Sequence, residues 1–91
     1  MNQPDVKSHK IEFPCADYPI KVVGDSGANY RDTVIEILSK YAKVDLNTLA
    51  ERQSSNGKYT TVQLHIVATG EDQLRDINSA LRATGIVHMV L

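Results

Sequence analysis

The sequence predicts an α+β fold in which two helices cover one face of a four-stranded antiparallel sheet. Two segments carry apolar residues at helical spacing, and two others alternate between apolar and polar residues as strands do. An Asn-Gly pair at residues 56–57 lies between two segments expected to be extended, which is typical of a hairpin. The resulting order, strand-helix-strand-strand-helix-strand, is the ferredoxin-like βαββαβ arrangement.

The chain is expected to begin with a flexible polar tail over residues 1–10, followed by a single domain over residues 11–91. Ile11 and Phe13 suit a short extended arm, because Pro14 disfavours helical geometry in the residue before it. The first strand is predicted at Tyr18 to Gly24, where apolar and polar residues begin to alternate.

A turn, GDSGAN, precedes the first helix, which is expected to start near Asn29 with that residue as its cap and with Asp32 at the third helical position. Helically spaced apolar residues then form one stripe, which fades around Tyr41 to Lys43. The stripe consists of Val34, Ile35, Ile37, Leu38, Tyr41 and Ala42.

The second strand is predicted over Leu49 to Ser54, and Asn56-Gly57 suits a two-residue type I′ turn. The third strand, Tyr59 to Ala68, alternates most clearly. A two-residue loop would place Glu51 opposite Val62 on the buried face. Either the edge strand has a bulge near Glu51, or the loop is longer than two residues.

Thr69 is expected to cap the second helix, and Gly85 is placed to end it in a left-handed conformation. The last strand is predicted over Ile86 to Leu91. Right-handed crossovers would place both helices on one face, with the first and third strands central. The other face of the sheet would then remain open.

Composition limits the functions that the chain can have. It has 91 residues, of which 42% are hydrophobic and 23% charged, and its net charge is −1 at pH 7, whereas general nucleic-acid binders are usually basic. Cys15 is the only cysteine, which favours a cytoplasmic location. The sequence shows no signal peptide and no apolar run long enough to cross a membrane.

Lys21, His65 and His88 are the candidate binding residues of the open face, where they lie on three adjacent strands. Such a group suits an anion better than a metal, because no further ligands complete a metal site. A solvated polar sheet face without a ligand is the favoured interpretation. No cofactor is therefore expected. Cys15 has no base beside it in the sequence, and no pair of carboxylates is forced together, so no catalytic residue is assigned and the chain is not expected to be an enzyme.

The turn before the first helix offers a second group of candidates, Gly24, Ser26 and Gly27, because a helix N-terminus can hold an anion. It lacks both the phosphate-loop and the dinucleotide fingerprints, which favours a simple tight turn. An RNA-binding platform is disfavoured, because Tyr59 is the only aromatic residue of the third strand.

Four short stretches resemble the small bacterial YbeD-like family, a domain of unknown function. They are EFP at residues 12–14, YPIKVVG at 18–24, SSNGKYTTV at 54–62 and VHMVL at 87–91. The resemblance implies a fold similar to that of ACT domains, which are regulatory modules that often bind amino acids between paired domains. Residues 24–30 occupy the place of the ACT ligand turn. The resemblance also suggests a link to lipoate or amino-acid metabolism, and it implies no catalytic residues.

The expected function is that of a non-enzymatic regulatory or adaptor module that contacts a protein partner or forms a homodimer. The alternative is a small-ligand or RNA-binding module that uses the open face and the loop of residues 24–30. A small-molecule effector would fit that alternative, whereas nucleic acid is disfavoured and no membrane association is expected.

Overall fold

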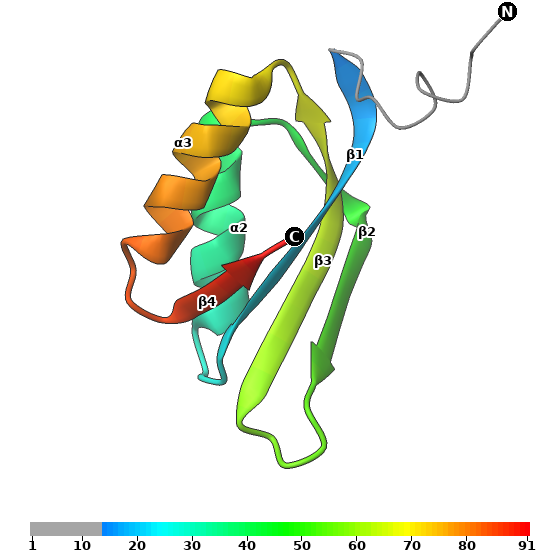
Figure 1. The fold of residues 1–91 in the computed structure, drawn as a ribbon. Helices are drawn as coiled ribbons and strands as arrows, with labels where there is room; N and C mark the ends of the chain where they lie inside the picture. The colour runs from blue at the N-terminus through cyan, green and yellow to red at the C-terminus, as the bar shows by residue number, and fades with distance from the viewer. Residues whose placement is uncertain (1–13) are drawn as a thin grey trace, which may run out of the picture.

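The computed structural model describes residues 14–91, so the predicted tail and the arm at Ile11 and Phe13 lie outside the described residues. Six elements follow one another in the predicted order (Figure 1). They are β1 (Cys15–Asp25), α2 (Tyr30–Tyr41), β2 (Val44–Gln53), β3 (Tyr59–Ala68), α3 (Glu71–Arg82) and β4 (Val87–Val90).

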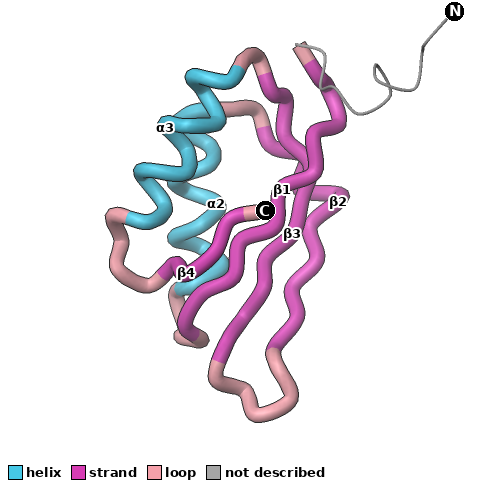
Figure 2. Tube along the Cα trace, in the orientation of Figure 1, coloured by secondary structure: helices cyan, strands magenta, loops and turns pink. Residues whose placement is uncertain are grey.

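The four strands form one antiparallel sheet in the order β2-β3-β1-β4. β1 and β3 are central, and both helices lie against the same face of the sheet, which confirms the ferredoxin-like prediction (Figures 1 and 2). None of the helices in residues 14–91 is long and apolar enough to cross a membrane.

The core lies between the sheet and the two helices, because alternate residues of β1 and β3 point toward the helices. Tyr30, at the start of α2, joins this core with only 2% of its surface exposed. The remaining core residues are Ile20, Val22, Val34, Leu38, Val62, Leu64, Ile66, Ile77, Leu81 and Val87. Tyr41, which was expected in the helical stripe, is instead exposed.

The hairpin keeps the predicted register, but its turn differs from the prediction. Glu51 pairs with Val62, and Ser54 donates its backbone N–H to Tyr59, so the loop has four residues, 55–58. The type I′ prediction is wrong, because the Gly57 N–H donates to the carbonyl of Ser54. Gly57 is therefore the fourth residue of that turn and not one of its two central residues. The Asn56 side chain stabilises this wider loop by accepting hydrogen bonds at 2.8 and 3.0 Å.

The structure also resolves the position of Glu51. β2 begins at Val44, earlier than predicted, and its register against β3 shifts between Asp45 and Ala50. Glu51 therefore does lie on the helix side, but at the edge of the sheet, where its carboxylate is 3.6 Å from the guanidinium of Arg31. Both of the expected irregularities, a bulge and a longer loop, are present.

The predicted side-chain caps of both helices are wrong. Asn29 makes no capping hydrogen bond, and α3 starts after Gly70 and not after Thr69. The Gln73 side chain instead fixes the segment before α3, because its oxygen accepts from the Thr69 N–H at 2.8 Å. Its amide nitrogen also donates to the carbonyls of Tyr41 at 2.8 Å and Val67 at 3.2 Å. Gln73 thus joins the ends of α2 and β3 to the start of α3.

The predicted left-handed glycine after α3 is confirmed, since Gly85 has φ +79°. Beyond it, β4 contains a bulge. Val87 pairs with Gly24 and Met89 pairs with the preceding residue of β1, Val23, so His88 is the extra residue. The bulge places two consecutive side chains, His88 and Met89, on the face without helices.

Candidate functional site

The face of the sheet that carries no helix presents a mixed polar and apolar surface. The register lines up Arg52, Thr61, Val23 and Met89 across the four strands. One step further along, Gln63 lies beside Lys21. We call this surface the open face; Figure 1 shows it on the side of the sheet away from α2 and α3.

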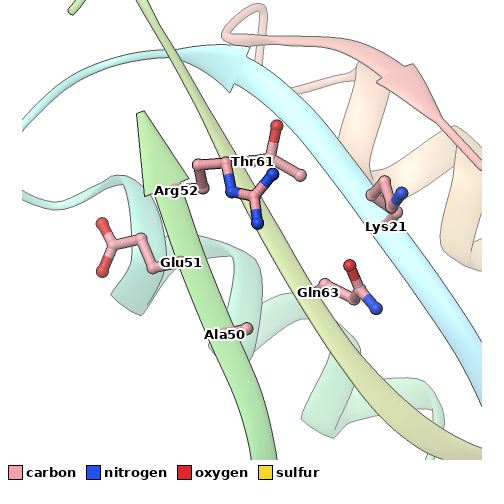
Figure 3. A pocket seen from close by; sticks show the side chains of 6 residues that line it. All are labelled: Lys21, Ala50, Glu51, Arg52, Thr61 and Gln63. Carbon is pink, nitrogen blue, oxygen red and sulfur yellow. The ribbon is translucent and has the colours of Figure 1, made fainter. Parts of the chain in front are cut away.

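A depression of about 350 Å³ lies on the open face over β2, β3 and β1. Its lining residues are Lys21, Ala50, Glu51, Arg52, Thr61 and Gln63. Figure 3 shows Arg52, Thr61, Gln63 and Lys21 on the same side of the sheet, whereas the Glu51 side chain points away from them. The functional groups of the depression are therefore two cations, a hydroxyl and an amide.

Neither cation of the depression is neutralised within the described chain. The ion pairs among residues 14–91 involve Arg31, Arg75 and His88, and none includes Lys21 or Arg52. Within the same residues, no side-chain hydrogen bond engages Gln63. The arrangement can accept an anion, because each of these groups can offer N–H donors.

A second polar cluster forms around the bulge of β4. His88 Nε2 lies 2.7 Å from Asp25 Oδ1, and the ring of Tyr59 meets the imidazole edge-on with centroids 5.7 Å apart. The Lys58 ammonium lies 5.4 Å from the Tyr59 ring centre. His88 and Asp25 resemble the base and orienting acid of a catalytic triad. Cys15, a possible nucleophile, lies at the opposite end of β1 from Asp25 and cannot complete the triad.

The predicted group of Lys21, His65 and His88 does not converge. All three side chains share the open face, but His65 pairs with Pro19 whereas His88 contacts Asp25. Those two positions of β1 are six residues apart, or about 20 Å along a strand. The three side chains therefore do not form one joint site, and a binding role for each of them stays a prediction. Among residues 14–91 no group of His, Cys, Asp and Glu is placed to hold a metal ion.

The turn between β1 and α2 is occupied by structural contacts. Ser26 Oγ is 2.7 Å from Thr60 Oγ1, so its hydroxyl already has a partner. Gly24 is buried, and a Cβ atom there would meet the ring of Tyr30 at 2.5 Å. Gly27 is exposed with open space around it. A ligand role for Gly24, Ser26 and Gly27 stays a prediction, but the first two have clear reasons to be present without a ligand.

Tyr30 fixes this turn to the sheet. Its hydroxyl donates a hydrogen bond of 2.9 Å to the carbonyl of Val22. Burial, together with the negative charge of Asp25, raises the pKa of Tyr30 to about 12. The phenol therefore stays protonated as a structural donor and is not available as a base at neutral pH.

Sequence reasoning missed Arg52, Thr61 and Asp25 as possible site residues. The hairpin register, which places Arg52 opposite Thr61, would have revealed the first two. Asp25 meets His88 only because of the bulge in β4, which no sequence pattern indicates.

Comparisons with known proteins give both a family and a fold. A family model described as "Protein of unknown function (DUF493)" matches residues 8–91. A UPF0250 protein of Pseudomonas putida strain F1 is 79% identical over 91 residues, and one of Pseudomonas syringae pv. syringae is 77% identical; both matches cover 100% of each chain.

Solved structures share the fold at low sequence identity. Protein HP0495 from H. pylori is 19% identical with a TM-score of 0.71, and the match covers 100% of this chain and 96% of that one. The ACT domain from the GTP pyrophosphokinase of Chlorobium tepidum is 20% identical with a TM-score of 0.64, covering 84% and 97%. The fold is therefore ACT-like, as the YbeD-like resemblance implied.

Proposed function

The chain belongs to the DUF493 (UPF0250) family, whose function is unknown, so we propose a function from the geometry of the chain itself. We propose that it is a non-enzymatic, ACT-like regulatory or adaptor module that acts through protein–protein contacts. We place it in the cytoplasm, where its single cysteine, Cys15, would stay reduced.

The apolar side chains on the uncovered sheet face are the observation that carries this proposal. Met89, Leu91 and Tyr59 are 47%, 63% and 37% exposed, although each is a large hydrophobic residue. Met89 pairs with Val23, and Leu91 exchanges backbone hydrogen bonds with Lys21, so these side chains continue across β4 onto β1. Apolar residues grouped in this way, with polar ones around them, favour a protein interface.

Two further observations support a non-enzymatic role. Within residues 14–91, no serine or cysteine lines the cationic depression, and no serine or cysteine side chain is hydrogen-bonded to the Asp25–His88 pair. The ACT domain of similar fold belongs to an enzyme, GTP pyrophosphokinase, which is consistent with a module that modulates another protein. A link to lipoate or amino-acid metabolism would follow if the partner acts in one of those pathways.

Small-ligand binding is the second candidate, and the depression at Lys21 and Arg52 is the observation that favours it. Its volume of about 350 Å³ lies at the lower end of the range for ligand pockets. RNA is the weaker form of this alternative, because Tyr59 is the only Phe, Tyr or Trp that the described strands place on the open face.

Capture of partners from bacterial cells, with two matched variants, tests the proposal. Met89→Asp places a charge on the open face, whereas Leu46→Asp makes the same change at an exposed position of β2, at the opposite edge of the sheet from β4. We expect one protein, or a second copy of the chain, to be enriched by the wild type and by Leu46→Asp but not by Met89→Asp. Its activity should change when the purified chain is added.

Light scattering over a wide concentration range tests self-association in parallel. A chain that stays monomeric and enriches no protein would refute the proposal. Amide chemical-shift changes on the open face or at residues 24–30 with amino acids, lipoate or short RNA, in the absence of any protein partner, would favour the second candidate.

A further inference from the structure

We propose that the depression between Lys21 and Arg52 is a docking site for an acidic residue in an extended segment of a partner protein. This inference rests on the proposed function and specifies the chemistry of the partner. It follows from the charge of the depression and from the apolar side chains beside it.

Among residues 14–91, no acid forms an ion pair with Lys21 or Arg52, and three acids of the sheet are engaged elsewhere. The carboxylate of Asp25 lies 2.7 Å from His88, and that of Glu51 turns toward Arg31 on the helix side. Asp45 accepts the backbone N–H of Asn47 at 3.1 Å. A carboxylate from outside would therefore meet two cations without competition from these acids.

The spacing of the strands suits a single carboxylate. Lys21 and Arg52 lie on the strands that flank β3, and their register partners on β3, Gln63 and Thr61, are two residues apart. The backbones of Lys21 and Arg52 are therefore about 12 Å apart, from two steps of roughly 4.8 Å across the sheet and about 7 Å along it. Their long side chains can reach toward each other over β3. Thr61 and Gln63 lie between them on β3 and add a hydroxyl and an amide as further donors.

The apolar neighbours define a second requirement for the partner. Val23 on β1 is in register with Thr61 on β3, and Met89 on β4 is in register with Val23, so the three side chains lie side by side across the open face. Residues i and i+2 of an extended segment point the same way and are about 7 Å apart. A segment with Asp or Glu two residues from Leu, Ile, Val or Met would place its acid in the depression and its apolar side chain over Val23.

A phosphate backbone fits this surface less well. RNA-binding sheets stack bases on several aromatic side chains, whereas Tyr59 is the only Phe, Tyr or Trp of the described open face, and its ring is already packed edge-on against His88. The net charge of the chain is −1, and the two cations lie beside apolar side chains instead of extending into a basic stripe. The surface thus favours a carboxylate accompanied by an apolar group.

NMR titration of the whole 91-residue chain with a designed probe tests the inference. The probe is the capped pentapeptide Gly-Leu-Gly-Glu-Gly, and its control has Gln in place of Glu. We expect saturable shifts at Lys21, Arg52, Thr61 and Gln63, with binding of the Glu peptide tighter by about fivefold, as befits one charge-assisted contact. Added salt should weaken that difference.

Two double variants localise the effect. Lys21→Gln with Arg52→Gln should remove the preference for Glu, whereas Lys40→Gln with Arg82→Gln, which removes the same charges from exposed helix positions, should preserve it. All four positions are exposed, so the amide spectra should confirm that both variants are folded. Equal binding of the two peptides, or an unchanged preference in the first variant, would overturn the inference.

A hexauridylate probe covers the alternative of phosphate. If it shifts the same amides at lower concentration than the Glu peptide does, the site is a phosphate site and the inference fails. The cellular capture separates this failure from that of the proposed function. A partner that is lost with Met89→Asp but kept with the Lys21/Arg52 double variant refutes the acidic docking site and leaves the proposed function standing.

Discussion

Replacing Tyr30 by phenylalanine should destabilise the protein at neutral pH but much less at high pH. At pH 8 the variant loses the hydrogen bond of 2.9 Å to Val22 and leaves that buried carbonyl without its donor. Such a loss costs about 1–2 kcal/mol. Tyr30 therefore anchors the turn at residues 24–30 through one measurable interaction.

The pH dependence follows from the raised pKa of Tyr30, which is about 12 in the folded protein and 10 in the unfolded chain. Above pH 10 the unfolded chain releases the phenolic proton while the folded protein retains it. The stability contributed by the neutral phenol is thus complete below pH 10 and is lost as the pH rises toward 12. By pH 11 the wild type should lose about 1.4 kcal/mol that Tyr30→Phe does not lose.

Urea denaturation followed by circular dichroism at pH 8 and pH 11 measures this difference. The gap in unfolding free energy between wild type and Tyr30→Phe should shrink by about 1.4 kcal/mol. Tyr41→Phe, at an exposed position, should differ from the wild type by less than about 0.5 kcal/mol at pH 8. A gap for Tyr30→Phe that is unchanged or larger at pH 11 would refute the role assigned to burial of the phenol.

Two further changes test the contacts that hold the fold together. Gly24→Ala should lower the unfolding free energy by about 1–3 kcal/mol, because the new methyl group would press on the backbone carbonyl of Ile86 and on the ring of Tyr30. Gly27→Ala, into open space, should be nearly neutral in the same urea melt. Gln73→Ala should lower the unfolding free energy by about 1–3 kcal/mol and reduce the hydrogen-exchange protection of α3, because it removes three hydrogen bonds. Gln53→Ala, at an exposed position, is the control. Equal protection of α3 in the two variants would contradict this reasoning.

The features predicted correctly from the sequence are those that depend on periodicity. Alternation in Tyr59–Ala68 predicted the bounds of β3 and its buried face, because a central strand packs under helices along its whole length. The hairpin register was also correct, since Asn56-Gly57 does lie at its centre of symmetry. The turn type was wrong because the Asn56 side chain bonds within a wider loop, a local interaction that competes with the two-residue turn.

The candidate site was predicted only in part. Lys21 lies on the predicted face, and the predicted hairpin register already places Arg52 opposite Thr61, so Arg52 could have been identified from the sequence. His88 was expected near Lys21 and instead lies beside Asp25. Contacts between side chains on different strands depend on bulges, and a bulge on an edge strand leaves no periodic signal in the sequence.

The bulge in β4 has an evolutionary consequence. Val87 and Met89 pair with successive residues of β1, so removing His88 would leave an unbroken strand. All the remaining side chains of β4 would stay on the faces that they occupy now. His88 is thus the one residue of β4 that the pairing with β1 does not require. Its deletion would leave Val87 in the core and Met89 on the open face. A lineage can therefore gain or lose the imidazole beside Asp25 while the rest of the sheet is inherited intact.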